Sequence, residues 1–152
     1  MEPVISHQGE GEVFELEPGS LVRFKVFSKD VDKVVEVYER ELPPRTIGAD
    51  PHLHATTIET FYVVSGTVDI LCGQLKDRYN AGSIVVVPHN TVHAYDNSDD
   101  IPAKLLIFFC PGLGHEEFFR ELAKLKRGPK DSYQHELDAL RRHFDSTSVA
   151  SE

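Results

Sequence analysis

Three histidines and one glutamate are the residues of this chain whose types and spacing could support chemistry. One residue separates His52 from His54, Glu59 follows after four more, and His93 ends the run Pro88-His-Asn-Thr-Val-His. Imidazole nitrogens and a carboxylate oxygen are ligands that suit a divalent transition metal. A single histidine is usually a hydrogen-bonded structural residue, but four such groups at these intervals are harder to explain that way. The pattern therefore predicts one mononuclear metal site.

A predicted strand over residues 57–64 would position the glutamate. This segment is β-branched and aromatic and leads into a Ser-Gly turn, which is typical of a strand end. Glu59 shares the parity of Phe61 and Val63, so we expect it on the inward face if those apolar side chains point inward. A carboxylate on a buried face needs a partner.

Two flanking segments would present the histidines. Side chains alternate along a strand, so His52 and His54 would point the same way if the backbone there is extended. The apolar run 83–88 closes with a proline, which cannot donate to a ladder and so marks a strand end. Beyond it we expect a turn, in which Asn90 tolerates positive φ, and this turn would deliver His93.

These segments resemble the two signature motifs of the cupin superfamily. The resemblance covers residues 48–97 and implies a small jelly-roll barrel whose four ligand residues bind a divalent metal. Gly48 lies nearer to His52 than the leading glycine of the family does, and Asn90 stands where glycine is common, but neither departure touches a ligand position. The matching patterns are His52-x-His54-x4-Glu59-x6-Gly66 and Gly82-x5-Pro88-x4-His93-x3-Asn97.

The rest of the chain is compatible with one all-β cupin barrel, a double-stranded β-helix, followed by two packed α-helices. A chain of 152 residues is one typical domain. We expect an N-terminal lead over 1–12, the barrel over 13–112, helices packed on it over 113–146 and a flexible tail over 147–152. Strands are predicted over 13–17, 21–27, 34–42, 57–64, 66–73, 74–79, 83–88 and 103–110, and helices over 115–125 and 131–144.

Charge and composition exclude several classes of protein. The formal charge of −9, from 16 basic and 25 acidic residues, opposes a phosphate backbone, so nucleic-acid binding is not expected. The sequence has no leader pattern and no apolar stretch of about 20 residues, which predicts a cytoplasmic protein without a membrane span. Cys72 and Cys110 lie in apolar strand-like sequence and are expected to be buried thiols without a disulfide.

Other polar residues near the motifs have two possible roles. His89 is expected to point away from the metal, with a supporting role as the alternative. Asp50, Asp96 and Asn97 flank the ligands and could each orient an imidazole through its second nitrogen, whereas an asparagine after a strand could equally form a turn. The remaining histidines, His7, His115, His135 and His143, are predicted to be solvated.

The apolar side chains of the predicted strands 57–64 and 103–110 suggest an apolar pocket for an aromatic or polyketide-like substrate. Four basic residues could hold an anionic group, yet each is expected to be a solvated charge on an outer strand or loop. These are Arg23, Lys25, Arg40 and Arg45. The predicted pocket lining is Phe61, Val63, Ala103, Leu105, Ile107 and Phe109.

The expected function is that of an oxidoreductase. Three neutral imidazoles and one carboxylate leave a divalent ion with a net charge of about +1, which attracts an enolate, carboxylate or catecholate. In an octahedral arrangement, substrate and dioxygen could take the remaining positions. The ligand set, its spacing and the Gly-His-Glu-Glu-Phe-Phe run at 114–119 resemble quercetinase-like cupins. That resemblance implies a dioxygenase of a small enol, flavonol or polyketide-like substrate, in which Glu59 is both ligand and catalytic proton acceptor.

Two other functions remain open. With zinc, the ion would act as a Lewis acid in an isomerase or polyketide cyclase, and Glu59 or His93 would assist proton transfer. A third possibility is a non-enzymatic protein that binds a small anion or sugar. Iron, manganese, nickel or cobalt would permit dioxygenation, whereas zinc would disfavour it. The resemblance also implies a homodimer.

Overall fold

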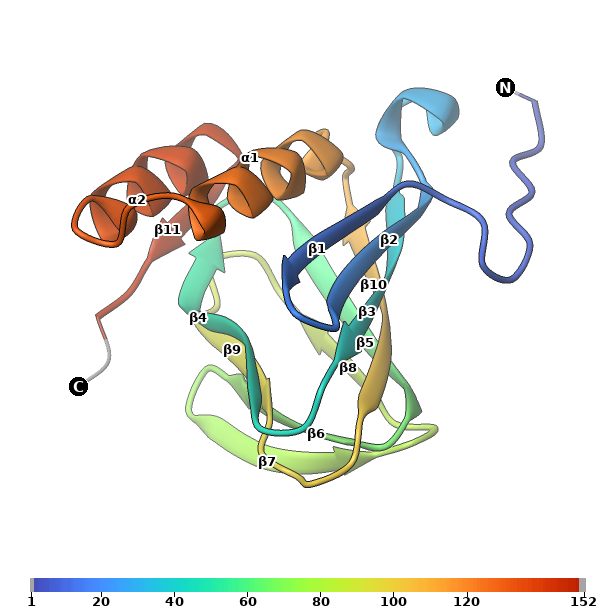
Figure 1. The fold of residues 1–152 in the computed structure, drawn as a ribbon. Coiled ribbons are helices and arrows are strands. Elements are labelled where there is room, and N and C mark those ends of the chain that lie inside the picture. The colour runs from blue at the N-terminus through green and yellow to red at the C-terminus, as the bar shows by residue number, and fades with distance from the viewer. Residues whose placement is uncertain (1, 151–152) are drawn as a thin grey trace.

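The computed structural model describes residues 2–150 and shows two β-sheets facing each other, with two helices at one end (Figure 1). Residues 2–12 form neither helix nor strand. A short 3-10 turn covers Ser28–Val31. The strands are β1 (Val13–Glu17), β2 (Ser20–Val26), β3 (Glu36–Leu42), β4 (Thr46–His54), β5 (Ile58–Ser65), β6 (Thr67–Cys72), β7 (Leu75–Asn80), β8 (Ile84–Val87), β9 (His93–Asn97), β10 (Ala103–Cys110) and β11 (Ser146–Ser148), and the helices are α1 (His115–Arg127) and α2 (Tyr133–His143).

The strands form a jelly-roll barrel, which confirms the predicted fold class. One sheet has the order β1-β2-β3-β10-β5-β8 and the other the order β11-β4-β9-β6-β7, with antiparallel pairing throughout. Strand β10 lies between β3 and β5, as its continuous apolar sequence predicts for the middle of a sheet. The β6–β7 hairpin bends at Gly73, whose φ of 62° is in the left-handed region.

The core fills the space between the two sheets. Phe24, Phe61, Leu105 and Ile107 have no exposed surface, and they alternate with more exposed neighbours along their strands. This period of two is the one expected for strands with a single buried face. Glu59 shares the parity of Phe61 and is buried with it, as predicted.

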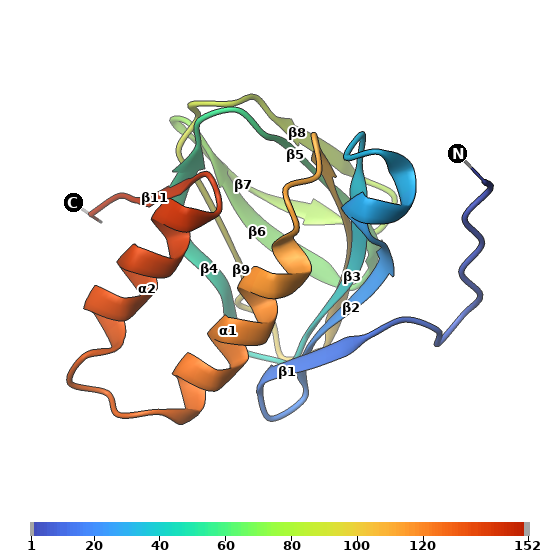
Figure 2. The same cartoon turned by 90° about the horizontal axis from the view of Figure 1, so that it is seen from above.

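Helices α1 and α2 lie side by side across one end of the barrel (Figure 2). Helix α1 packs on β1 and on α2, and α2 packs on β11. Phe119 and Leu122 of α1 and Leu137 of α2 are buried, which is what their helical spacing predicts for the apolar faces. The two helices therefore cover the end of the barrel where the ligand histidines lie.

The end of the chain differs from the prediction of a flexible tail over 147–152. Strand β11 pairs with β4, with Ser146 opposite His54 and Ser148 opposite His52. The backbone amide of Val149 also donates to the carbonyl oxygen of Pro51 at 3.0 Å. Polar Ser-Thr-Ser sequence gives no strand signal, so the pairing depends on the free edge that β4 offers. Residues 151–152 of the predicted tail lie outside the described part.

The cysteines also differ from expectation. Cys72 is half-buried and Cys110 is exposed, so the prediction of two buried thiols is wrong. Cys110 ends β10 on the outward side of the strand, where apolar sequence does not guarantee burial. Both thiols are free. Within residues 2–150, no helix is long and apolar enough to span a membrane.

Candidate metal centre

The four predicted ligands come from three strands and meet at one end of the barrel. His52 and His54 lie on β4, Glu59 on β5 and His93 at the start of β9. His52 and His93 are paired across the β4–β9 ladder, whereas Glu59 reaches the site from the other sheet. One potential ligand atom from each of the four lies within 4.8 Å of all the others, and all four side chains are buried. The arrangement is suited to one metal ion.

The turn between β8 and β9 brings His93 into position. Asn90 has a φ of 60°, as its place in the turn predicts, and its backbone amide donates to the carbonyl oxygen of His54 at 2.6 Å. This bond ties the turn to the strand that carries two ligands. His89 is exposed. Within residues 2–150, the only hydrogen-bond partner of its ring is the Asn90 side chain. The His89 ring points away from the site, as expected.

Backbone carbonyl oxygens orient all three imidazoles. Each ring directs Nδ1 to a carbonyl, which makes Nδ1 the donor and turns the Nε2 lone pair toward the centre. The acceptors are the carbonyl oxygens of Asp50 (2.8 Å from His52), Thr91 (2.9 Å from His93) and Asp145 (3.2 Å from His54). Asp50 thus contributes its main chain, and its carboxylate does not take the role considered for it.

The other two candidates for orienting an imidazole have different roles. Asn97 is buried, and its Nδ2 donates to the carbonyl oxygens of Leu42, Pro43 and Ile101, so it closes a turn. Asp96 is half-buried, and burial together with the charge of Asp69 raises its pKa. Neither side chain hydrogen-bonds a ligand, so the turn alternative for Asn97 is the correct one.

The electrostatics of the site favour a bound cation. The Glu59 carboxylate lies 2.8 Å from Nε2 of His93 and 3.4 Å from Nε2 of His54. Burial would raise the pKa of Glu59, but the two imidazoles outweigh it and hold the pKa well below its usual range. Burial lowers the pKa of His52, which keeps that ring neutral. The buried Nε2 of His54 has no hydrogen-bond partner among the described residues, and a metal would supply one.

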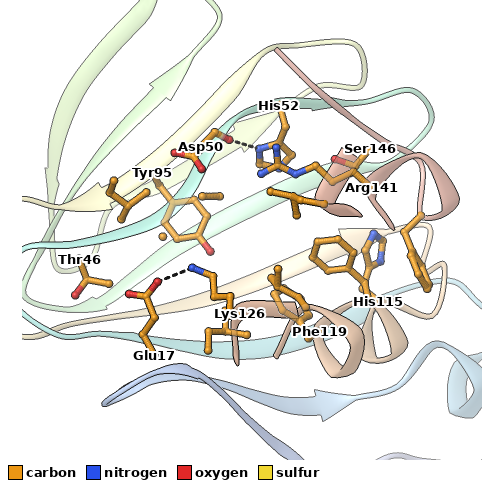
Figure 3. A pocket seen from close by; sticks show the side chains of 18 of the residues that line it. Glu17, Thr46, Asp50, His52, Tyr95, His115, Phe119, Lys126, Arg141 and Ser146 are labelled. Carbon is orange, nitrogen blue, oxygen red and sulfur yellow. Dashed lines mark hydrogen bonds and ion pairs between the residues drawn. The ribbon is translucent and has the colours of Figure 1, made fainter. Parts of the chain in front are cut away.

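A cavity of about 460 Å³ adjoins the ligands and lies under the helices (Figure 3). The predicted lining is wrong except for Phe109, because the other five residues are packed in the core between the sheets. The open space lies instead between the barrel end and α1 and α2. Its aromatic lining comes from Tyr38, Tyr95, Phe109, Phe118, Phe119, Tyr133 and Phe144.

His115 and Glu36 form a buried pair in the cavity wall. His115 Nδ1 lies 2.7 Å from Glu36 Oε2, and Glu36 Oε1 accepts the backbone amides of Gly114 and His115 at 2.6 and 3.0 Å. The prediction that His115 is solvated is therefore wrong. The imidazole stacks on Phe109, with ring centroids 4.0 Å apart, and its Nε2 is buried without a partner. A signal was present, since His115 shares a helical face with Phe119 and Leu122.

Basic residues also take unexpected places. Arg40, predicted to be solvated, is buried and donates to Ser20 Oγ at 2.9 Å and to two backbone carbonyls. Its parity with Tyr38 and Leu42 indicated an inward position. Arg45 is exposed, as predicted, and pairs with Asp100 at the edge of the cavity. Arg23 and Lys25 are half-buried and donate to backbone carbonyl oxygens, and Arg23 also pairs with Glu39 at 3.6 Å. The three histidines predicted to be solvated are exposed, namely His7, His135 and His143.

Arg141 is a buried cation in the cavity wall that was not predicted from the sequence. It has 6% of its surface exposed and lies on α2. Tyr133 and Leu137 precede it at steps of four residues, so a charged side chain interrupts the apolar stripe of the helix. Ser146, the first residue of β11, lines the same cavity and is also buried.

The sequence matches known proteins over the barrel. Residues 38–109 match the model of the cupin domain family. A quercetin 2,3-dioxygenase from Bacillus subtilis (strain 168) is 32% identical over 120 residues, which cover 79% of this chain and 34% of that protein. This chain thus spans about a third of the length of that relative.

Solved structures share the fold. KdgF from Halomonas sp. superposes with a TM-score of 0.64 at 20% identity, covering 74% of this chain and 96% of that one. A predicted oxalate decarboxylase from Thermotoga maritima gives 0.61 at 15%, covering 72% and 99%. The nucleoside dehydratase Pac13 from Streptomyces gives 0.59 at 19%, covering 76% and 88%. At these identities the likeness concerns the fold alone.

Proposed function

Because this chain belongs to the cupin family and buries three histidines and a glutamate beside an aromatic cavity, we propose that it is a metal-dependent dioxygenase. The substrate would be a small enol, flavonol or aromatic polyketide-like compound that chelates the metal. The observation that carries this proposal is the convergence of the four ligand atoms within 4.8 Å next to a cavity of about 460 Å³. Similarity to a quercetin 2,3-dioxygenase supports it.

His52, His54, Glu59 and His93 would hold the ion. When bound there, iron, manganese, nickel or cobalt would supply Lewis acidity toward a chelating oxygen and redox access to dioxygen. Glu59 is ionised because the two imidazoles lower its pKa, which also makes it a weak base. Its carboxylate would accept the proton of a substrate hydroxyl only because the bound ion lowers the pKa of that hydroxyl. The aromatic walls would hold a planar substrate and exclude water from it.

Metal analysis and oxygen uptake test the proposal together. Protein purified without chelator is analysed for elements, then supplied with quercetin or a small enediol in an oxygen electrode. We expect about one redox-active ion per chain and oxygen consumption that matches substrate loss. Glu59→Gln should lose this activity, whereas the exposed His89→Ala should keep it. Stoichiometric zinc without oxygen uptake would contradict dioxygenation and favour the isomerase or cyclase.

Assembly and location are proposed on sequence resemblance and composition. We expect a cytoplasmic homodimer, and light scattering on purified protein measures the mass directly. A mass near the 17.1 kDa of one chain would contradict the dimer.

A further inference from the structure

Three polar groups from the C-terminal part of the chain reach the cavity with hydrogen-bonding capacity left over. They are the Arg141 guanidinium, Ser146 Oγ and His115 Nε2. In Figure 3, Arg141 extends from α2 toward the ligand His52, and Ser146 lies close by. Aromatic cavities with a few convergent polar groups are typical of small-molecule sites, in which the polar groups fix the orientation of the ligand.

Arg141 is a buried cation without a counterion. Its one hydrogen bond to a described residue runs from Nη1 to Ser148 Oγ at 2.8 Å. No carboxylate in residues 2–150 lies within ion-pairing distance. The charges of Asp50, which is exposed to water, and of Asp138 act on the guanidinium from further away, and Asp138 is linked to it only through the Ser148 hydroxyl, which donates to the Asp138 carboxylate. Burying an unpaired charge is costly unless a partner is supplied. An anionic ligand in the cavity would be that partner.

Other cations around the cavity differ from Arg141. Lys126 pairs with Glu17 at 2.6 Å, and Arg45 pairs with Asp100 at 2.8 Å. Their charges are compensated within the chain and reach solvent. Lys130 also lines the cavity and donates to the Lys126 carbonyl oxygen, but it is exposed to water. Arg141 is thus the lining cation that is buried and has no direct carboxylate partner among the described residues.

The neighbouring polar atoms fit the same ligand. Ser146 Oγ is buried without a partner, so its hydroxyl can donate to an anion. The His115 ring is fixed because Nδ1 is bound by Glu36, and its free Nε2 offers a contact to a substrate hydroxyl. Leaving such groups unsatisfied costs stability, and a ligand that satisfies them would recover it.

We propose that Arg141 and Ser146 form a carboxylate-binding subsite, so that the substrate carries an anionic arm in addition to its metal-chelating group. This inference rests on the proposed function for the chelating half of the substrate. The planar guanidinium fork matches the two oxygens of a carboxylate, which favours this anion. The metal centre, at about +1, and Arg141 would together match a substrate with two negative charges.

Binding of catechols to the zinc-loaded protein tests the subsite by calorimetry. Zinc does not turn over dioxygen, so binding is measured whether or not the protein is a dioxygenase. The probes are methylcatechol and three catechols with carboxylate arms of increasing length: protocatechuate, homoprotocatechuate and dihydrocaffeate. Zinc content and methylcatechol affinity report the metal site, and preference for an acid reports the subsite.

We expect at least one acid to bind the wild type about tenfold more tightly than methylcatechol. Arg141→Gln should remove this preference and leave methylcatechol affinity unchanged. The matched control Arg142→Gln removes the same charge from an exposed neighbour and should keep the preference. If no acid is preferred by the wild type, or if the preference survives Arg141→Gln, the subsite does not exist.

A second variant tests the subsite in case Arg141→Gln does not fold. Ser146 Oγ makes no hydrogen bond to the described residues, so Ser146→Ala should fold as the wild type does. We expect it to reduce the preference about threefold. If Arg141→Gln shows no melting transition, an unchanged preference in Ser146→Ala overturns the proposal.

Discussion

Asp145 holds the ligand His54 from a position 91 residues further along the chain. Its carbonyl oxygen lies 3.2 Å from His54 Nδ1. Its carboxylate accepts the Thr56 amide at 2.9 Å, the Thr56 hydroxyl at 2.8 Å and the Thr57 amide at 3.0 Å. Asp145, which follows the end of α2, therefore fixes both the ring of a metal ligand and the loop that leads to Glu59.

The Asp145 contacts predict a pH-dependent loss of stability. Burial would raise the pKa of Asp145, but hydrogen bonds from Thr56 and Thr57 outweigh it and lower the pKa. A carboxyl with a lowered folded-state pKa stabilises the fold above its unfolded value of about 3.9, and this contribution is lost as pH falls through the folded value. Asp145→Asn should therefore lower the free energy of unfolding by about 1–2 kcal/mol at neutral pH.

Urea unfolding at neutral pH and in acid measures this effect. The stability difference between wild type and Asp145→Asn should shrink as the pH falls below about 4, because the wild-type carboxyl then becomes protonated. Asparagine tolerates the left-handed φ of 61° at this position, so backbone strain should not contribute to the measured difference in stability. Asp131→Asn, at an exposed position, serves as control. A difference independent of pH would contradict the assigned role.

Removal of single ligands should abolish metal binding. His54→Ala and His93→Ala each leave three of the four groups, and we expect metal content to fall from about one ion per chain to about a tenth or less. Elemental analysis after gel filtration measures it. His89→Ala changes an exposed histidine of the same turn and should retain the metal. Full metal content in both ligand variants would show that the ion binds elsewhere.

The buried pair of Glu36 and His115 should contribute strongly to the attachment of α1 to the barrel, in addition to the apolar face of the helix. Glu36→Ala leaves the imidazole and the two amides at the helix start without an acceptor, and should cost about 3–5 kcal/mol of unfolding free energy. Denaturant unfolding monitored by circular dichroism measures the change. Glu41→Ala, on the same strand and paired with Lys104, should cost less than about 1 kcal/mol. Equal costs would contradict this assignment.

Gly48 makes room for a tyrosine of the cavity wall. A Cβ at this position would lie 2.0 Å from Cε2 of Tyr95. Gly48→Ala should therefore displace the ring and cost about 1–3 kcal/mol, measured by thermal or urea unfolding. Gly128→Ala, whose Cβ would meet no atom closer than 3.4 Å, is the control. A Gly48→Ala protein as stable as the wild type would mean that the ring lies elsewhere.

The metal ligands and most strands could be predicted because their signals are local. Parity along β5 places Glu59 beside Phe61 on the buried face, and a turn residue of positive φ introduces His93. Such rules depend on a few neighbouring residues and can therefore be applied without knowledge of the tertiary structure. The same rules applied more strictly would have placed Glu36 and Arg40 inward and His115 and Arg141 on buried helix faces.

Other parts of the site depend on long-range packing and had no local signal. Every residue has a carbonyl oxygen, so nothing in the sequence marks those of Asp50, Thr91 and Asp145 as the acceptors for the imidazoles. The cavity lies where α1 and α2 meet the barrel end, and its location follows from how those helices dock. The pairing of β11 with β4 likewise depends on an available strand edge.

The pairing of β11 with β4 has a consequence for how the protein matures during synthesis. Strand β4 carries His52 and His54, yet its edge partner, Ser146–Ser148, is translated more than eighty residues later. Asp145, which orients His54, leaves the ribosome in the same late segment. The barrel strands can assemble earlier, but the ligand strand obtains its outer neighbour only after both helices have emerged. A ribosome stalled before residue 145 would therefore carry a barrel whose metal-binding strand is still open on one side.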